Sequence, residues 1–191
     1  MAETTGTTRN SKAGKAKGSK TKSKASSVTS EPITAFSTAL SLSSATRSKL
    51  IASLQQHMAD NDDLYSQTKF AHWNVKGDGF FYLHKLFDEL AGMIQPFTDE
   101  LAERITLLGG IARGTSRQTA ATSSLEEFPD GPQDGTSYLQ ALQARFAEHA
   151  DNSRKHAEAA SELDATTEDL FIEISRTVDQ ALYFIEAHLQ K

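Results

Sequence analysis

Apolar residues recur every three or four positions over most of the chain from Ser44 onward. This is the period of an α-helix that buries one face. No segment alternates apolar and polar residues with the period of two that is typical of strands. The pattern therefore predicts an all-α protein with four long helices.

The first predicted helix runs from Ser44 to about Asn74, and either Ser43 or Ser44 is a suitable N-cap. Its buried stripe mixes apolar and polar side chains: Leu50, Leu54, Met58, Asn61, Tyr65, Thr68 and His72. Residues 71–90, AHWNVKGDGFFYLHKLFDEL, place His72, His84 and Asp88 beside phenylalanines and leucines, a mixture that a soluble helical protein does not need, so this stretch marks a candidate site.

The second predicted helix has the most regular apolar stripe, from Phe80 to Leu108. Residues 76–79, KGDG, precede it and predict a turn, because glycine adopts the positive φ that other residues resist. Gly109 and Gly110 follow it and predict its end.

A linker rich in Thr, Ser, Pro and Gly, residues 111–136, separates these two helices from a third. The third helix is marked by apolar and small residues from Leu139 to Ala160, and the fourth begins near Asp164. Four helices of about 25 to 30 residues, each about 40 Å long, predict a four-helix bundle. The linker is long enough to cross the end of the bundle.

Residues 1–30 differ from the rest of the chain in composition and charge. They are rich in Gly, Ser, Thr and Lys and carry a formal charge of +6, which leaves −11 for the remainder of a chain whose net charge is −5. Such a segment cannot bury enough apolar surface to fold, so we interpret it as a disordered arm and residues 31–191 as the helical domain. Its basic residues are candidates for binding the phosphates of DNA: Arg9, Lys12, Lys15, Lys17, Lys20, Lys22 and Lys24. A solubilising tail and a cleaved targeting peptide are the alternatives.

The composition limits the chemistry further. The chain has no cysteine, so any metal must be bound by His, Asp or Glu, and such ligands suit iron, manganese, zinc or magnesium. It has no run of about eighteen apolar residues and no apolar segment near its start, so we expect no membrane span and a cytoplasmic protein.

Four residues of ligand type lie on the second helix, beside its apolar stripe: His84, Asp88, Asp99 and Glu103. At about 100° per residue they lie at about 0°, 40°, 60° and 100° around the helix, so they share one face. Asp88 and Glu103 are separated by about 22 Å of helix rise, which is too far for one ion.

Two copies of this helix that cross antiparallel about a twofold axis would remove that difficulty. His84 and Asp88 of one copy would then approach Asp99 and Glu103 of the other, and His72 at the end of the first helix could join them. The pattern thus predicts a metal site shared between two chains, two per dimer. Taken singly, each carboxylate is as typical of a solvated helix surface, and each histidine of a core residue.

The segment Lys69 to Gly110 contains the string KFAHWNVKGDGFFYLHKLFDEL and, further on, DELAERITLLGG. These motifs resemble those of Dps, the DNA-binding protein from starved cells, a family of small ferritin-like proteins. The resemblance extends from about residue 44 to residue 190. It implies a ferritin-like four-helix bundle that assembles from twofold dimers into a hollow shell of twelve subunits.

The resemblance also implies roles for individual residues. His72, His84 and Asp88 of one subunit, with Asp99 and Glu103 of its twofold mate, correspond to the family's ferroxidase centre. Trp73, Lys69 and Arg104 correspond to residues around that centre, for which packing is the alternative role. Three acids near the start of the fourth helix could line an iron-entry pore, although acids at a helix N-terminus are stabilised there in any case: Asp164, Asp169 and Glu173.

The other histidines give weaker signals. His149 and His156 share a face of the third helix, but their Asp, Asn, Ser and Arg neighbours favour a solvated surface. His57 and His188 have no partner at ligand spacing. No histidine has a glutamate three residues before it, so the Glu-x-x-His motif of intrachain di-iron bundles is absent from the sequence.

By resemblance, the expected function is oxidation of Fe(II), preferably by hydrogen peroxide, with storage of the ferric product and protection of DNA. The arm would add sequence-independent binding to double-stranded DNA, near the nucleoid. Two other functions stay open: a structural nucleoid protein with a vestigial metal site, and a ferroxidase shell that does not bind DNA.

Overall fold

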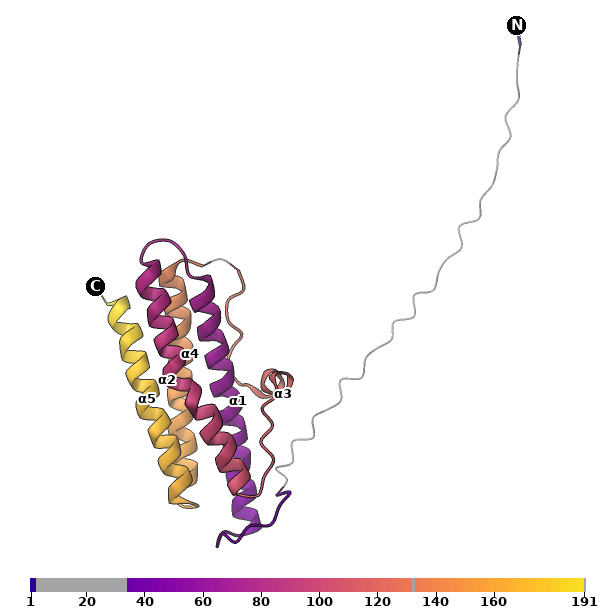
Figure 1. Ribbon diagram of the computed structural model, residues 1–191, viewed down its shortest axis with the longest axis vertical. Coiled ribbons are helices and arrows are strands. Elements are labelled where there is room, and N and C mark those ends of the chain that lie inside the picture. Colours follow the sequence, from indigo (N-terminus) through magenta and orange to yellow (C-terminus); the bar gives the residue numbers. More distant parts are fainter. Residues whose placement is uncertain (3–33, 132, 191) are drawn as a thin grey trace. The chain divides into compact units, whose positions relative to one another are not determined.

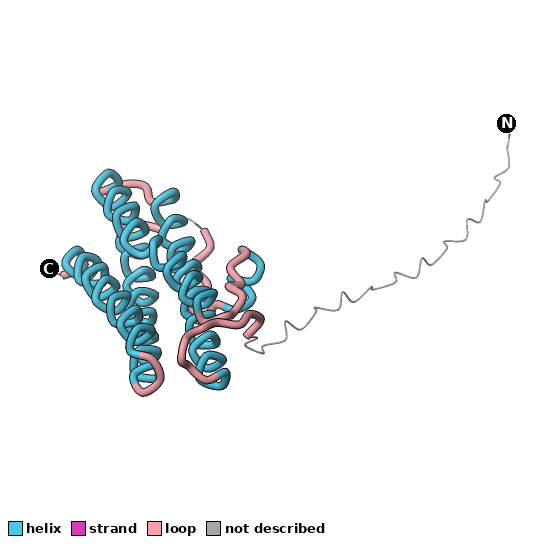
Figure 2. Tube along the Cα trace, turned by 60° about the horizontal axis from the view of Figure 1, so that its bottom comes forward, coloured by secondary structure: helices cyan, strands magenta, loops and turns pink. Residues whose placement is uncertain are grey.

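The computed structural model describes residues 1–2, 34–131 and 133–190, and all regular secondary structure in these ranges is helical (Figure 2). Four long helices form a bundle, and a short fifth helix lies in the connection between the second and third of them (Figure 1). Their bounds are α1 Ser44–Asn74, α2 Phe80–Leu107, α3 Ser116–Thr122, α4 Gly135–Ser161 and α5 Ala165–Leu189. The predicted all-α bundle with a long crossover is confirmed.

The helix ends follow the local chemistry of the sequence. The Ser43 side chain accepts a 3.0 Å hydrogen bond from the backbone N–H three residues later, and α1 ends at Asn74, as predicted. Gly77 and Gly79 adopt φ angles of +82° and +77° in the turn to α2. Gly109, at +85°, follows the end of α2. These angles require glycine, because a Cβ atom resists positive φ.

The bundle packs as two pairs, α1 with α2 and α4 with α5, and further contacts join α1 to α4 and α2 to α5. Each long helix contributes large residues to one core: Leu54, Phe87, Phe146 and Phe171 are all fully buried. Burial of each such side chain stabilises the fold by roughly 1.5–3 kcal/mol.

Polar side chains of α1 form hydrogen bonds with the crossover, residues 108–134. The Asp60 carboxylate accepts a 2.7 Å hydrogen bond from the Ser124 backbone N–H. The Gln55 side chain pairs with both backbone groups of Arg113, at 2.9 Å each. Irregular chain has few backbone partners of its own, so these contacts satisfy its backbone groups and account for the burial of Asp60.

The short helix α3 was not predicted within the linker. It is seven residues long, too short to show an apolar period. Its sequence signal was a capping box, in which the side chains of Thr115 and Gln118 satisfy each other's backbone N–H groups.

The prediction of a disordered, basic arm is not tested by this architecture. Apart from its first two residues, the arm over residues 1–30 lies outside the described residues, and so do its basic side chains.

Within the described ranges, every helix is too short or too polar to span a membrane.

Candidate metal centre

His72, near the end of α1, and His84, in the second turn of α2, lie side by side across the tight turn that joins the helices. Their rings stack with centroids 3.8 Å apart and an angle of 22° between the planes. Each ring also bonds to the other residue's backbone: His72 Nδ1 lies 2.7 Å from the His84 carbonyl oxygen, and His84 Nδ1 lies 2.9 Å from the His72 carbonyl oxygen.

These reciprocal bonds determine which nitrogen carries the proton. A carbonyl oxygen only accepts, so both Nδ1 atoms must donate, and in the neutral rings both Nε2 atoms carry a lone pair. A histidine whose Nδ1–H is held by a carbonyl is oriented to bind a metal through Nε2. The local fold therefore presents two oriented imidazole ligands.

Asp88, one turn after His84 on α2, adds a carboxylate to the pair. Its Oδ1 lies 3.9 Å from His72 Nε2 and 2.6 Å from the Lys69 ammonium. The hydrogen bond from Lys69 lowers the pKa of Asp88; burial opposes this shift, and the charges of Lys69, His72 and Lys85 add to it. The carboxylate is consequently ionised at neutral pH and ready to bind a cation.

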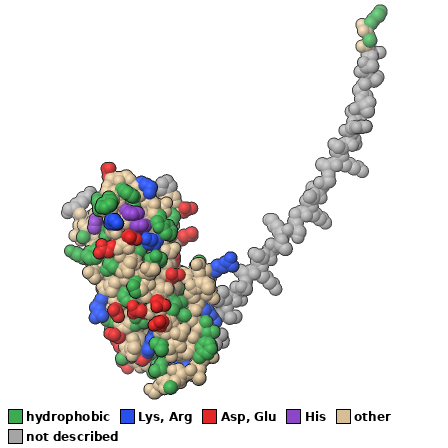
Figure 3. Space-filling model, in the orientation of Figure 1, with side chains coloured by type: hydrophobic (Ala, Val, Ile, Leu, Met, Phe, Trp, Pro, Cys, Tyr) green, Lys and Arg blue, Asp and Glu red, His purple; other side chains and the backbone are tan. Residues whose placement is uncertain are grey.

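The remaining candidate ligands, Asp99 and Glu103, lie on the exposed side of α2, further along the same helix. Glu100 and Glu173 are near them. Burial, followed by the charges of Glu173, Asp99 and Glu103, raises the pKa of Glu100. Figure 3 shows acidic side chains gathered on one part of this face and histidines nearer its other end. Sequence reasoning missed Glu100, although it adjoins Asp99.

The two groups of ligands do not form one site within a chain. Among the residues that the structure describes, no three His, Asp or Glu side chains are placed to hold a metal ion together. Helix rise alone separates Asp88 from Asp99 by about 16 Å. Each chain thus presents two separate groups of candidate ligands, or candidate half-sites: a histidine end and an acidic end.

Two grooves lie on the face made by α1, α2 and α3. One, of about 310 Å³, is lined by Lys69 and Trp73 at the histidine end. The other, of about 520 Å³, is lined by Asp99 at the acidic end. Asp62 and Tyr65 of α1 line both grooves, and Asp99 is the candidate ligand that lines one of them.

Comparison with known proteins agrees with this architecture. The family model of the ferritin-like domain matches residues 51–191. The DNA protection during starvation protein of Agrobacterium fabrum is 36% identical over 151 residues, which cover 78% of this chain and 93% of that protein. The chain belongs to the Dps family of ferritin-like proteins.

Solved structures support the same assignment. DpsA14 from Streptomyces coelicolor superimposes with a TM-score of 0.80 at 30% identity and covers 84% of this chain and 95% of that one. Dps from Mycobacterium smegmatis gives a TM-score of 0.78 at 28% identity and covers 83% and 90% of the two chains. The ferritin-like fold expected from the motifs is thereby confirmed.

The residues expected around the Dps centre have different surroundings. Lys69 contacts the candidate ligand Asp88, and Trp73 is 63% exposed, on the groove at the histidine end. Arg104 instead points to α5, where its guanidinium binds Asp164 and Thr167. Its packing role is therefore the one that the contacts support.

The candidate pore residues divide in the same way. Asp164 is the N-cap of α5, accepts a hydrogen bond from the Thr167 backbone N–H and is paired with Arg104. Burial raises the pKa of Asp164, but the hydrogen bonds from Thr167 and Arg104 and the arginine charge outweigh it and lower the pKa. Asp169 and Glu173 are exposed.

The interpretation of His149 and His156 as solvated surface residues was wrong. His149 is fully buried and His156 is partly buried. His57, which seemed to lack a partner, is also buried and stacks on His149 with ring centroids 4.3 Å apart. The polar neighbours that suggested a solvated face, such as Asp151 and Arg154, point to another side of α4 and are exposed.

Proposed function

We propose that this Dps protein oxidises Fe(II) at a centre shared between two chains and stores the ferric product. One observation carries the proposal: His72 and His84 each donate Nδ1–H to the other's backbone carbonyl, which leaves both Nε2 lone pairs for a metal, and His72 Nε2 lies 3.9 Å from the Asp88 carboxylate. A pair of histidines that only packed would not need this orientation.

Iron is the substrate, and the donor set suits it. Imidazole nitrogen binds Fe(II), and the carboxylates of Asp88, with Asp99 and Glu103 from a second chain, favour the harder Fe(III) product. Two Fe(II) ions give one electron each to hydrogen peroxide, which takes up two protons and leaves as two water molecules. Peroxide as the preferred oxidant is an expectation from the family resemblance.

The second chain is part of the proposal. In an isologous dimer the histidine end of each chain would meet the acidic end of the other, which would complete the ligand set that the described residues of one chain do not bring together. Both grooves would then be covered by the partner. Twelve subunits in a hollow shell, as the resemblance implies, would provide the space for the mineral.

The test is anaerobic loading with Fe(II) followed by peroxide, with ferric absorbance as the readout. A His72→Ala/His84→Ala variant of unchanged oligomeric state should oxidise iron at least about tenfold more slowly, since both nitrogen ligands are lost. His188→Ala is the matched control, because His188 is exposed on α5 and outside the centre. Equal rates in the wild type and the double variant would refute the ferroxidase assignment.

Binding of double-stranded DNA is proposed for the basic arm, residues 1–30. The name of the Agrobacterium fabrum relative associates that protein with DNA protection. Twelve arms on one shell would bind polyanions multivalently and without sequence preference. Protein of this kind would act in the cytoplasm, next to the nucleoid.

Deletion of residues 1–30 tests the arm separately from the centre. We expect DNA retardation in a low-salt gel to disappear while the rate of iron oxidation is unchanged. Unchanged retardation would refute the role of the arm. DNA binding without iron oxidation in the full chain would favour a structural nucleoid protein.

A further inference from the structure

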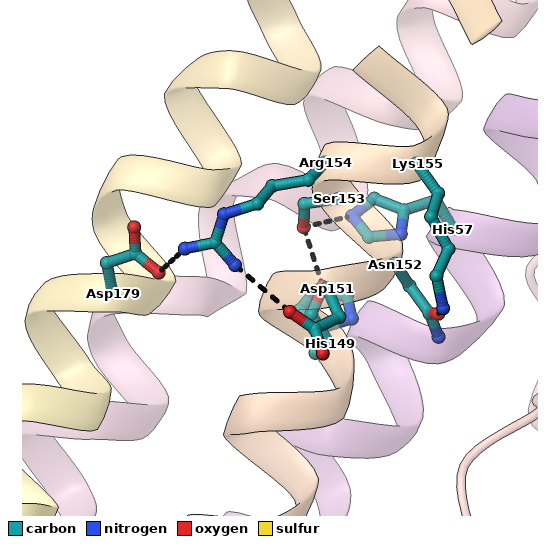
Figure 4. Close-up of polar contacts among 8 residues, drawn as sticks. All are labelled: His57, His149, Asp151, Asn152, Ser153, Arg154, Lys155 and Asp179. Carbon is teal, nitrogen blue, oxygen red and sulfur yellow. Dashed lines mark hydrogen bonds and ion pairs between the residues drawn. The ribbon is translucent and has the colours of Figure 1, made fainter. Parts of the chain in front are cut away.

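Three histidines form a cluster inside the bundle, away from the candidate metal centre: His57 of α1 and His149 and His156 of α4. The rings of His57 and His149 are parallel within 4°, with centroids 4.3 Å apart, and His156 meets His57 edge-on at 5.1 Å. Phe171 of α5 covers both His57 and His156, at 5.4 and 5.2 Å. Figure 4 shows His57 and His149 together with Ser153 between the helices.

The hydrogen bonds of the cluster identify the tautomer of His57. The Ser153 hydroxyl donates to the His149 carbonyl oxygen at 2.8 Å, so its oxygen accepts from His57 Nε2 at 3.0 Å. The proton of the neutral ring is therefore on Nε2. His57 Nδ1 carries a lone pair, is fully buried and has no hydrogen-bond partner.

The same reasoning applies to His149. The Asn61 side-chain NH₂ group donates to the Ile94 carbonyl and the Thr98 hydroxyl at 2.9 Å each, which leaves the Asn61 oxygen as an acceptor. His149 Nε2 donates to that oxygen at 3.2 Å. His149 Nδ1 is consequently a second buried lone pair without a partner.

These two lone pairs are not arranged for a metal ion. A lone pair lies in the plane of its ring, and parallel stacked rings direct their lone pairs along separate planes. A bound metal would have to lie about 2.0–2.1 Å from each nitrogen. The described residues contain no group of three such ligands that could hold an ion. Each of these basic lone pairs can instead take up a proton.

Little around the cluster could balance the charge that a proton brings. Among the described residues no carboxylate forms an ion pair with any of the three rings. On α1, Asp60 favours protonation of His156, while Lys155 on α4 opposes it. Phe171 of α5 packs against His57 and His156, and the α2 groups bound to Asn61 are the uncharged Ile94 carbonyl and Thr98 hydroxyl. Two protonated rings at 4.3 Å would also repel each other.

We propose that His57, His149 and His156 form an acid-sensitive latch between α1 and α4, which holds the bundle closed while the three rings are neutral and opens it when they take up protons. The latch goes beyond the proposed iron chemistry and does not rest on it.

The pKa values of the three histidines agree with what the geometry of the cluster implies. Burial lowers the pKa of His149 from 6.5 to about 3, with a smaller effect of His156. Burial, and then the charges of His149 and His156, lower the pKa of His57 well below 6.5. Burial also lowers the pKa of His156. Below about pH 6.5 the unfolded chain therefore binds protons at these histidines that the folded bundle does not bind. The free energy of unfolding consequently decreases as the pH falls below 6.5.

The experiment measures equilibrium unfolding of the full chain by guanidinium at pH 7, 6 and 5, at one protein concentration, with far-UV circular dichroism as the readout. Each neutral histidine should lower the ratio of folded to unfolded protein by up to about tenfold per pH unit below its usual pKa. The variant His57→Gln/His149→Gln keeps an Nε2–H donor at each position and removes both imidazole nitrogens that can take up a proton. Its pH dependence should be shallower than that of the wild type by at least about tenfold per unit.

His188→Gln is the matched control, since it removes an exposed histidine, and it should keep the wild-type pH dependence. If the double variant does not fold, His156→Gln, at the partly buried edge, should still give a shallower pH dependence. A wild-type stability that does not change between pH 7 and 5 would overturn the proposal. So would a wild-type slope retained in the glutamine variants. Stabilisation by Zn²⁺ at pH 7 in the wild type but not in the double variant would replace the latch with a metal site.

Discussion

The proposed metal centre, if shared between two chains, makes a quantitative prediction about mixed subunits. Let one chain carry His72→Ala/His84→Ala and a second carry Asp99→Asn/Glu103→Gln. Each variant alone should be inactive, since every site contains one altered half. In a mixed dimer, one site combines both altered halves, and the other combines the intact histidine end with the intact acidic end. One of the two sites in each mixed dimer is therefore complete.

The expected recovery follows from this pairing. Random assembly of equal amounts makes about half of the dimers mixed, so about one quarter of all sites should be intact. Recovery is expected only if the histidine end and the acidic end of each site belong to different chains. The helix rise of about 16 Å between Asp88 and Asp99 supports this arrangement.

The assay is co-expression of the two chains with different tags, purification through both tags in turn, and peroxide-driven iron oxidation per subunit. Separately purified variants, mixed without exchange of subunits, are the control and should stay inactive. A co-expressed assembly no faster than its two parents would refute the shared centre. The ligands would then have to lie within one chain or elsewhere.

Two further predictions concern charged pairs. Lys69→Met removes the ammonium that lies 2.6 Å from Asp88 Oδ1 and would compete there with a metal ion. Because a partly exposed ion pair contributes up to about 1 kcal/mol, the variant should bind Co²⁺ up to about fivefold more tightly in calorimetry. Weaker binding would contradict this competition. Arg104→Ala should lower the free energy of unfolding by about 2–3 kcal/mol, since it removes hydrogen bonds to an ionised group whose side chain is 14% exposed. The matched control, Arg154→Ala, breaks pairs in which the arginine is 51% exposed and should cost less than about 1 kcal/mol in the same chemical denaturation. Equal losses for the two arginines would show that burial does not distinguish these pairs.

The fold was largely predictable because its signals are local. The Ser43 cap, the glycines of the turn and the end of α2 at Gly109 depend on backbone preferences that neighbouring residues determine. The face shared by His84, Asp88, Asp99 and Glu103 follows from helical period alone. The seven-residue helix α3 escaped because only its capping box, and no period, marked it.

The contacts across the turn were not predictable in this way. Nothing in the twelve-residue spacing of His72 and His84 states that each ring donates to the other's backbone, since this depends on the angle at which α1 meets α2. The role of Arg104 likewise depends on where α5 begins beside α2. Such contacts join residues that are distant in the chain, so local preferences carry no information about them.

The sequence by itself determined four helices, their ends, a face of ligand-type residues and the Dps resemblance. Only the tertiary structure decided which faces are covered. His149 and His156 share a side of α4 in any helix, but α1 and α5 bury that side and bring His57 against it. The physical reason is that period shows which residues point together, whereas burial depends on the neighbouring helix, and burial is what turns three ordinary histidines into groups that resist protonation.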